Sequence, residues 1–159
     1  MTTNSPIDPS YIDLCLWAKE RGLQGERYPY ACHALDATGA ALVLWDHVLS
    51  PGLKKRISHG LGTNEDHTRS LVGFWSGCHD TGKLIREFQE QIPTDLSAYP
   101  HTPRPADRTG HAFATYEWLT TALPRLGYSN EDDYVLALVA QLLGGHHGVY
   151  PQALNDFYE

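Results

Sequence analysis

The centre of this 159-residue chain reads Cys78-His79-Asp80-Thr81-Gly82-Lys83. The adjacent imidazole and carboxylate can bind one divalent metal ion from a single turn of backbone. The carboxylate has two oxygens, so it can also bridge to a second ion. Buried histidines and acids need partners, and a metal ion satisfies several of them at once. The stretch therefore predicts a metal site.

Further histidines stand at wide intervals on both sides of this pair. His33 precedes it, and His111 and the doublet His146-His147 follow it. Adjacent histidines diverge on a regular helix, but a break such as Gly144-Gly145 can turn both to one point. His33 alone also suits a cap or core position, so the joint pattern carries the argument. It indicates a metal site assembled from several helices and hydrolysis of a phosphodiester. The other histidines are assigned to the surface: His47, His59, His67 and His101.

Composition places the chain among single globular domains. Hydrophobic residues make up 42% and charged residues 19% of the sequence, which suits a folded domain with a sizeable core. No apolar run has the length of a membrane span, and the polar N-terminus has no signal-peptide character. The three cysteines, Cys15, Cys32 and Cys78, show no metal-type pairing. We therefore expect free thiols, a cytoplasmic location and no membrane partner.

The charge balance limits how the chain can bind nucleic acid. The formal net charge is −7, which argues against binding by bulk electrostatics alone. The sequence offers one short basic cluster, Lys54-Lys55-Arg56, and two arginines in the stretch 93–108, Arg104 and Arg108. If the chain cuts nucleic acid, metal ions or a partner must bring the phosphate to it.

Apolar spacing and helix-end signals predict an almost wholly helical chain, and hence an all-α fold. Helices are expected over residues 10–22, 34–49, 64–78, 82–92, 111–123 and 131–143, with Thr63 or Asn64 and Ser129 as caps. Pro51-Gly52 is interpreted as a helix stop, so residues 51–62 are expected to form a linker. The proline-rich stretch 93–108 is expected to be a loop without helix.

These motifs together resemble the HD phosphohydrolase superfamily and, more narrowly, the HD nuclease domain of the CRISPR type I helicase-nuclease. The resemblance covers about residues 10–150 and implies an all-α, HD-domain helical bundle. The residues that carry it are Tyr30-Ala31-Cys32-His33-Ala34-Leu35-Asp36-Ala37 with Leu44-Trp45, His79-Asp80-Thr81-Gly82-Lys83-Leu84 with Phe88-Gln89, Gly110-His111, and Gly145-His146-His147-Gly148.

The resemblance implies two divalent metal ions bridged by Asp80. One ion would be held by His33, His79 and Asp80, and the other by Asp80, His111, His146 and His147. Such nitrogen-rich ligation favours transition metals, namely manganese, iron, cobalt or nickel, over magnesium. Asp80 and Lys83 are the expected catalytic residues, and the lysine ammonium would donate to the phosphate or to the developing charge.

The function that the resemblance implies is metal-dependent hydrolysis of single-stranded DNA in CRISPR interference, a form of antiviral defence. The implied partners are single-stranded DNA, a helicase domain or subunit, and a CRISPR RNA-guided surveillance complex. Two alternatives stay open. One is an HD phosphohydrolase that acts on nucleotides or cyclic dinucleotides. The other is a metal-stabilised interaction module that docks a helicase or a surveillance complex without cutting.

The end of the chain departs from the family pattern. In the family a further aspartate, well downstream, completes the shell of the first metal, whereas the late acid here is Asp156, shortly after His147. We therefore expect residues 1–159 to be one HD-type nuclease domain that either forms the N-terminal part of a longer polypeptide or lacks its C-terminal helices. No Walker-type lysine loop is present, so no unwinding is expected from these residues.

Overall fold

The structure, a computed structural model, describes residues 12–93, 95–97, 110–127 and 133–148. These residues form a helical domain, so the predicted all-α class is confirmed. Its helices are α1 (Tyr30–His47), α2 (Pro51–Gly60), α3 (Glu65–Cys78), α4 (Arg86–Gln89), α5 (His111–Arg125) and α6 (Asp133–Gly144), and the 3₁₀ helix η2 (Thr81–Leu84) lies between α3 and α4. A short antiparallel sheet, β1 (Trp17–Lys19) and β2 (Tyr28–Pro29), precedes α1.

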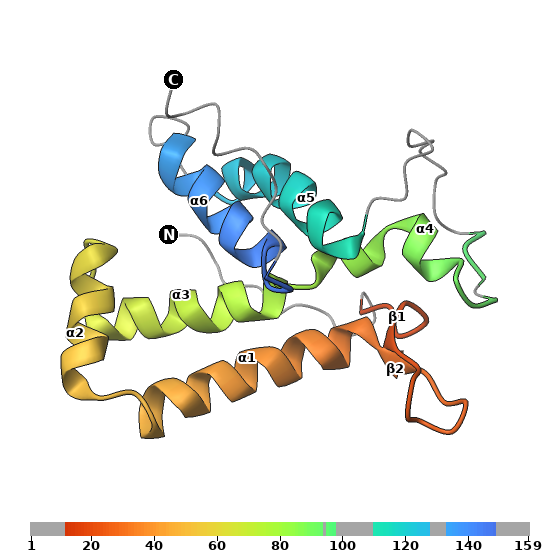
Figure 1. Ribbon diagram of the computed structural model, residues 1–159, viewed down its shortest axis with the longest axis horizontal. Coiled ribbons are helices and arrows are strands. Elements are labelled where there is room, and N and C mark those ends of the chain that lie inside the picture. The colour runs from red at the N-terminus through yellow and green to blue at the C-terminus, as the bar shows by residue number, and fades with distance from the viewer. Residues whose placement is uncertain (1–11, 94, 98–109, 128–132, 149–159) are drawn as a thin grey trace.

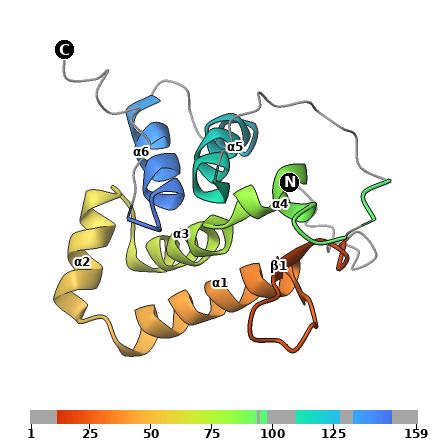
Figure 2. The same ribbon diagram turned by 45° about the vertical axis from the view of Figure 1, so that its right-hand side comes forward.

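The helices form two layers that meet at the C-terminal end of α3. The helices α1 and α3 lie side by side and run in opposite directions, with α2 across one end and the small sheet near the other (Figures 1 and 2). The helices α5 and α6 pack on each other above α3. Trp75 and Cys78 of α3 pack against the core between α5 and α6. The buried residues of that core are Leu119, Leu123, Leu136, Val139 and Ala140.

Two glycines let α1 and α3 approach closely. A Cβ atom added at Gly73 would lie 2.9 Å from a methyl carbon of Leu42, and one added at Gly77 would lie 2.6 Å from the hydroxyl of Thr38. Because α1 carries His33 and α3 leads directly into His79, this contact brings the first histidine close to the His-Asp pair.

The predicted helix over residues 10–22 is wrong in its described part. Trp17 and Ala18 are buried in β1 instead. The Trp17 N–H donates to the side-chain oxygen of Gln89 at 3.0 Å, and the indole Nε1–H donates to the Gln89 carbonyl at 3.1 Å. These distant partners satisfy backbone groups that a helix would have satisfied locally, so the apolar spacing alone was misleading.

The predicted linker over residues 51–62 is also wrong, because these residues form α2. Pro51 occupies the first turn of the helix, where a missing N–H leaves no bond unmade. The Ser50 hydroxyl caps the same turn by accepting from the Leu53 N–H at 3.3 Å. The signal that was interpreted as the end of one helix is therefore the beginning of the next.

The other predicted helices are confirmed with shifted ends. The helix expected at 34–49 begins earlier, at Tyr30, and the helix expected at 64–78 is α3, capped by Asn64, whose side chain accepts from the His67 N–H at 2.8 Å. The helix expected at 82–92 is split into η2 and α4 by Ile85, which has an extended backbone. The expected helices at 111–123 and 131–143 are α5 and α6.

Gln89 ties the N-terminal strand to the segment that follows the His-Asp pair. Its side chain is completely buried. Besides accepting from Trp17, its Nε2 donates to the Trp17 carbonyl at 2.8 Å and to the Lys83 carbonyl at 2.7 Å. Because every one of these polar groups has a partner at low solvent exposure, the bonds fix β1 beside η2.

Several smaller expectations can be checked among the described residues. The three cysteines are free thiols, as predicted. None of the described helices combines the length and the hydrophobicity needed to cross a membrane. The side chains of His47, His59 and His67 are exposed, as predicted. The positions of His101, Arg104, Arg108, Ser129 and Asp156 lie outside the described residues.

Candidate metal centre

The His-Asp pair lies where α3 ends and the chain turns into η2. His79 is the C-terminal cap of α3, and Asp80 precedes the first residue of η2. Gly82 presses against the first turn of α5, since an added Cβ would lie 1.8 Å from the His111 carbonyl oxygen. The Gly82 N–H donates to the Thr115 hydroxyl at 2.8 Å, and that hydroxyl donates to the His111 carbonyl at 3.0 Å. This chain of bonds sets His111 beside Asp80.

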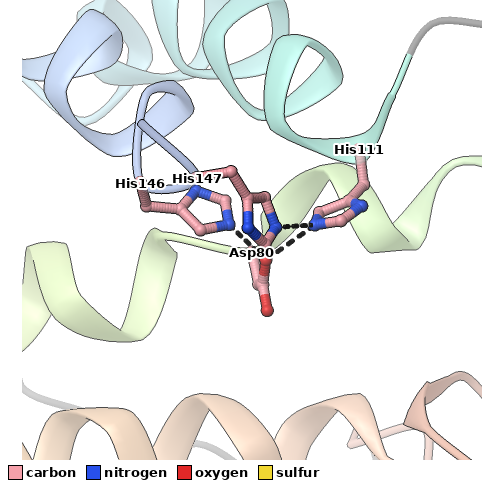
Figure 3. A group of neighbouring side chains, drawn as sticks. All are labelled: Asp80, His111, His146 and His147. Carbon is pink, nitrogen blue, oxygen red and sulfur yellow. Dashed lines mark hydrogen bonds and ion pairs between the residues drawn. The ribbon is translucent and has the colours of Figure 1, made fainter. Parts of the chain in front are cut away.

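The histidine doublet enters the site from the turn that ends α6. Gly144 packs against α5, where an added Cβ would lie 2.7 Å from the Tyr116 Cβ. The helix stops there, and the turn that follows directs both His146 and His147 toward Asp80 (Figure 3). The expectation that a break at Gly144-Gly145 turns both rings to one point is therefore confirmed by the geometry.

One oxygen of Asp80 faces the α1 side of the cluster. The Asp80 side chain is only 5% exposed. Its Oδ2 lies 2.7 Å from His33 Nε2, 2.6 Å from Lys83 Nζ and 3.3 Å from His79 Nε2. A group of three candidate ligands thus converges on this oxygen: His33, His79 and Asp80.

The other oxygen faces the histidines of α5 and of the turn after α6. Oδ1 lies 3.0 Å from His146 Nε2 and 3.4 Å from His111 Nε2, without the geometry of a hydrogen bond in either case. His111 Nε2 lies 2.8 Å from His147 Nε2. The second group of candidate ligands is Asp80, His111, His146 and His147. Asp80 is common to both groups, and all the ligands expected from the sequence lie in one cluster.

The hydrogen bonds behind the histidines show that the cluster fits a cation. His79 Nδ1 and His146 Nδ1 each lie 2.7 Å from a backbone carbonyl, that of Ser76 and that of Leu143. A carbonyl can only accept, so each Nδ1 carries a proton. In the neutral ring the Nε2 lone pair then faces a carboxylate oxygen, an arrangement that repels unless a cation lies between. Among the described residues, the buried Asp80 Oδ1 has no hydrogen-bond partner.

The charge states also suit metal ligation. Burial alone raises the pKa of Asp80, but close contacts with its neighbours lower that pKa far below the ordinary value, so the carboxylate is ionised. Burial lowers the pKa of His33 and lowers that of His111 to about 4, so both rings are neutral at neutral pH. The contact with Asp80 raises the pKa of His146. Metal ions require deprotonated ligands, and Asp80, His33 and His111 already offer them.

Lys83 is the cation that balances Asp80 in the protein alone. Its side chain is 11% exposed and belongs to η2. Besides the 2.6 Å contact with Asp80, its ammonium lies 5.9 Å from the centroid of the Phe88 ring. The predicted catalytic lysine is therefore inside the cluster rather than on an ordinary surface.

Sequence reasoning missed the supporting role of two residues, although Gln89 was already part of the second motif. Thr115 and Gln89 are fully buried and hold the backbone of His111 and of Lys83. The spacing of Thr115, one helical turn after His111, was the available signal. The basic cluster Lys54-Lys55-Arg56 lies on α2, at the opposite end of α1 from the small sheet (Figure 1). It does not contribute to the candidate centre.

A buried aspartate shared by two histidine groups, at the junction of helical layers, defines the HD class of metal-dependent domains. The comparison with known families agrees: residues 17–157 match the family described as Cas3, HD domain. This chain belongs to that family.

Individual relatives support the same family assignment. The curated "CRISPR-associated nuclease/helicase Cas3" of Streptococcus thermophilus is 28% identical over 156 residues, which cover 87% of this chain and 16% of that protein. The crystal structure of T. fusca Cas3 superposes with a TM-score of 0.84 at 54% identity, over 88% of this chain and 15% of that chain. A chain of a pre-nicking CRISPR RNA-guided surveillance complex superposes with a TM-score of 0.83 at 54% identity. The match covers 88% of this chain and 17% of that chain. The chain thus spans about one sixth of the length of these relatives.

Proposed function

We propose that this chain is a metal-dependent nuclease domain that hydrolyses the phosphodiester bonds of single-stranded DNA in type I CRISPR interference. The observation that carries the proposal is the buried carboxylate of Asp80, which belongs to both groups of candidate ligands. Two divalent ions held in this way supply an activated water and neutralise charge at a scissile phosphate. The ions are proposed to be transition metals (manganese, iron, cobalt or nickel), because the ligands are mostly imidazole nitrogens.

In this proposal the residues of the chain have separate roles. Asp80 and the five histidines hold the ions: His33, His79, His111, His146 and His147. Lys83 is held by Asp80 in the protein alone. With divalent ions bound by Asp80, its charge would be balanced by them, and the role of the Lys83 ammonium would be to donate to a phosphate oxygen or to the charge that develops during hydrolysis.

The proposed partners follow from the relatives. One relative is named a nuclease/helicase, and another is a chain of an RNA-guided surveillance complex. We propose that the domain works in the cytoplasm with a helicase domain or subunit and with such a complex, which together deliver single-stranded DNA. The net charge of −7 supports this dependence, because the chain has little bulk attraction for nucleic acid.

The deciding experiment is a nuclease assay on circular single-stranded DNA after stringent chelation and addition of single metals. Manganese, cobalt or nickel should activate more strongly than magnesium, and calcium should fail, because calcium prefers oxygen ligands. Full activity with magnesium alone would contradict the proposed metals. Hydrolysis of nucleotides or cyclic dinucleotides without action on DNA would favour the nucleotide phosphohydrolase. Metal binding with no hydrolysis of either substrate would favour the interaction module.

The two metal sites should differ in affinity. The group that contains His111 offers four ligands and the group that contains His33 offers three, so a metal titration followed by calorimetry should show a tight step and a weaker one. His33→Ala should remove only the weak step, whereas His111→Ala should weaken the tight step. Elemental analysis of the purified protein checks the stoichiometry. Two steps of equal affinity, with full occupancy of both sites, would contradict this order.

A further inference from the structure

A groove runs from the candidate metal centre to the N-terminal strand. It has a volume of about 630 Å³. One wall comes from β1 and the turn after it, and the other from η2, α4 and the residues that follow α4. His111 lines this groove and is a candidate ligand, and Lys83 lines it and contacts Asp80, so the groove opens directly onto the centre.

The charges in this groove differ from those of the whole chain. Among the described residues that line it are three basic side chains, Lys19, Arg21 and Lys83, and one acidic side chain, Glu20. The chain as a whole carries a net charge of −7, so a basic lining at this place is not a consequence of composition. Lys19 and Arg21 are exposed, and their charges are available to a ligand. Such a local field attracts an anionic chain despite an unfavourable total charge.

The groove also offers an aromatic surface and a rigid wall. Phe88 lines it beside His111, with the two ring centroids 5.6 Å apart. Grooves for single-stranded nucleic acid combine basic side chains along the backbone with aromatic rings near the bases. The wall that carries Lys19 is fixed to the centre, because Gln89 bonds to Trp17 on one side and to the Lys83 carbonyl on the other. The backbone of β1, which carries Lys19, therefore lies at a set position relative to Asp80.

We propose that this groove binds the single strand next to the scissile bond, with Lys19 and Arg21 holding backbone phosphates. This inference rests on the proposed nuclease function and adds the path of the substrate to it. It assigns a role to two residues that no motif in the sequence singles out. It also explains how the described part of the chain, whose cluster Lys54-Lys55-Arg56 lies on α2, can position DNA at the centre.

The test compares Lys19→Glu/Arg21→Glu with a matched variant, Lys55→Glu/Arg56→Glu, whose residues are equally exposed on α2. Affinity for a fluorescent oligothymidine is measured by anisotropy in calcium buffer at several salt concentrations. The groove variant should bind about 10-fold more weakly at low salt. Its salt dependence should flatten by about 1.4 in the slope of log K against log salt, as expected for two lost phosphate contacts on a single strand. The α2 variant, which has the same charge change, should bind within about 2-fold of the unmodified chain.

A second measurement separates this inference from the proposed function. With manganese, bis(p-nitrophenyl) phosphate reports on the metal centre alone, and the groove variant should lose much more DNA cleavage than hydrolysis of this small diester. No hydrolysis of the diester by the unmodified chain counts against the nuclease function, while the anisotropy result still decides on the groove. The proposal that the groove binds DNA is overturned if the unmodified chain and the groove variant have equal DNA affinity. This includes the case in which neither binds. Lys19→Gln/Arg21→Gln, which adds no negative charge, repeats the test if the first variant does not fold.

Discussion

Replacing Asp80 with alanine should abolish phosphodiester hydrolysis and weaken both metal sites at once. Asp80 is the one residue common to both groups of candidate ligands, and it is 4% exposed. Removing a single group that stabilises a transition-state charge already lowers rates by about 10²–10³-fold. Losing a shared metal ligand should lower the rate on the order of 10³-fold or more. Cleavage of circular single-stranded DNA and a metal titration measure the two effects separately.

The control for this experiment is His59→Ala, which removes an exposed histidine on α2. It should leave both cleavage and metal content unchanged. Circular dichroism should show that Asp80→Ala keeps its helices, because the core between α5 and α6 does not depend on this carboxylate. An Asp80→Ala protein that still binds metal and still cuts DNA would disprove the two-metal centre.

Among the glycines compared in the described part of the chain, replacing Gly82 with alanine should be the most destabilising. An added Cβ would lie 1.8 Å from the His111 carbonyl and 2.6 Å from the Thr115 backbone nitrogen. Both are backbone atoms of α5, so the helix itself must move. Such overpacking typically lowers the free energy of unfolding by about 1–3 kcal/mol, and a backbone clash of this size should reach or exceed the upper end. Because His111 moves with α5, the tight metal step should weaken as well.

The matched control is Gly39→Ala in the middle of α1. Here an added Cβ meets nothing within 4 Å. Glycine is unfavourable in a helix relative to alanine, so this substitution should raise the free energy of unfolding by about 0.4–1 kcal/mol. Urea denaturation compares the two variants with the unmodified chain. If Gly82→Ala unfolds at the same urea concentration as Gly39→Ala, the close contact between η2 and α5 is not present in solution.

Local signals in the sequence were sufficient for most of the helices and for the members of the cluster. Asn64 predicts the beginning of α3, and the glycines at 144 and 145 predict the end of α6. The candidate ligands could be proposed because imidazole and carboxylate groups in this order resemble the motifs of one family. Each of these signals acts within a few residues of the feature that it predicts.

The failures share a different cause. β1 was predicted as helix because its partner, Gln89, lies 72 residues away. α2 was predicted as a linker because Pro51 suits either the end or the beginning of a helix, and only Ser50 decides. The groove residues Lys19 and Arg21 become neighbours of Lys83 only when the chain is folded. Non-local contacts of this kind leave no periodic pattern in the sequence.

The candidate ligands come from α1, from the end of α3, from the start of α5 and from the turn after α6. Two metal ions bound there would therefore act as a cross-link between segments that are far apart in the chain. By closing long loops, it would stabilise the folded domain over an unfolded chain that cannot present these side chains together. Metal supply would then determine the stability of the folded domain as well as the proposed hydrolysis.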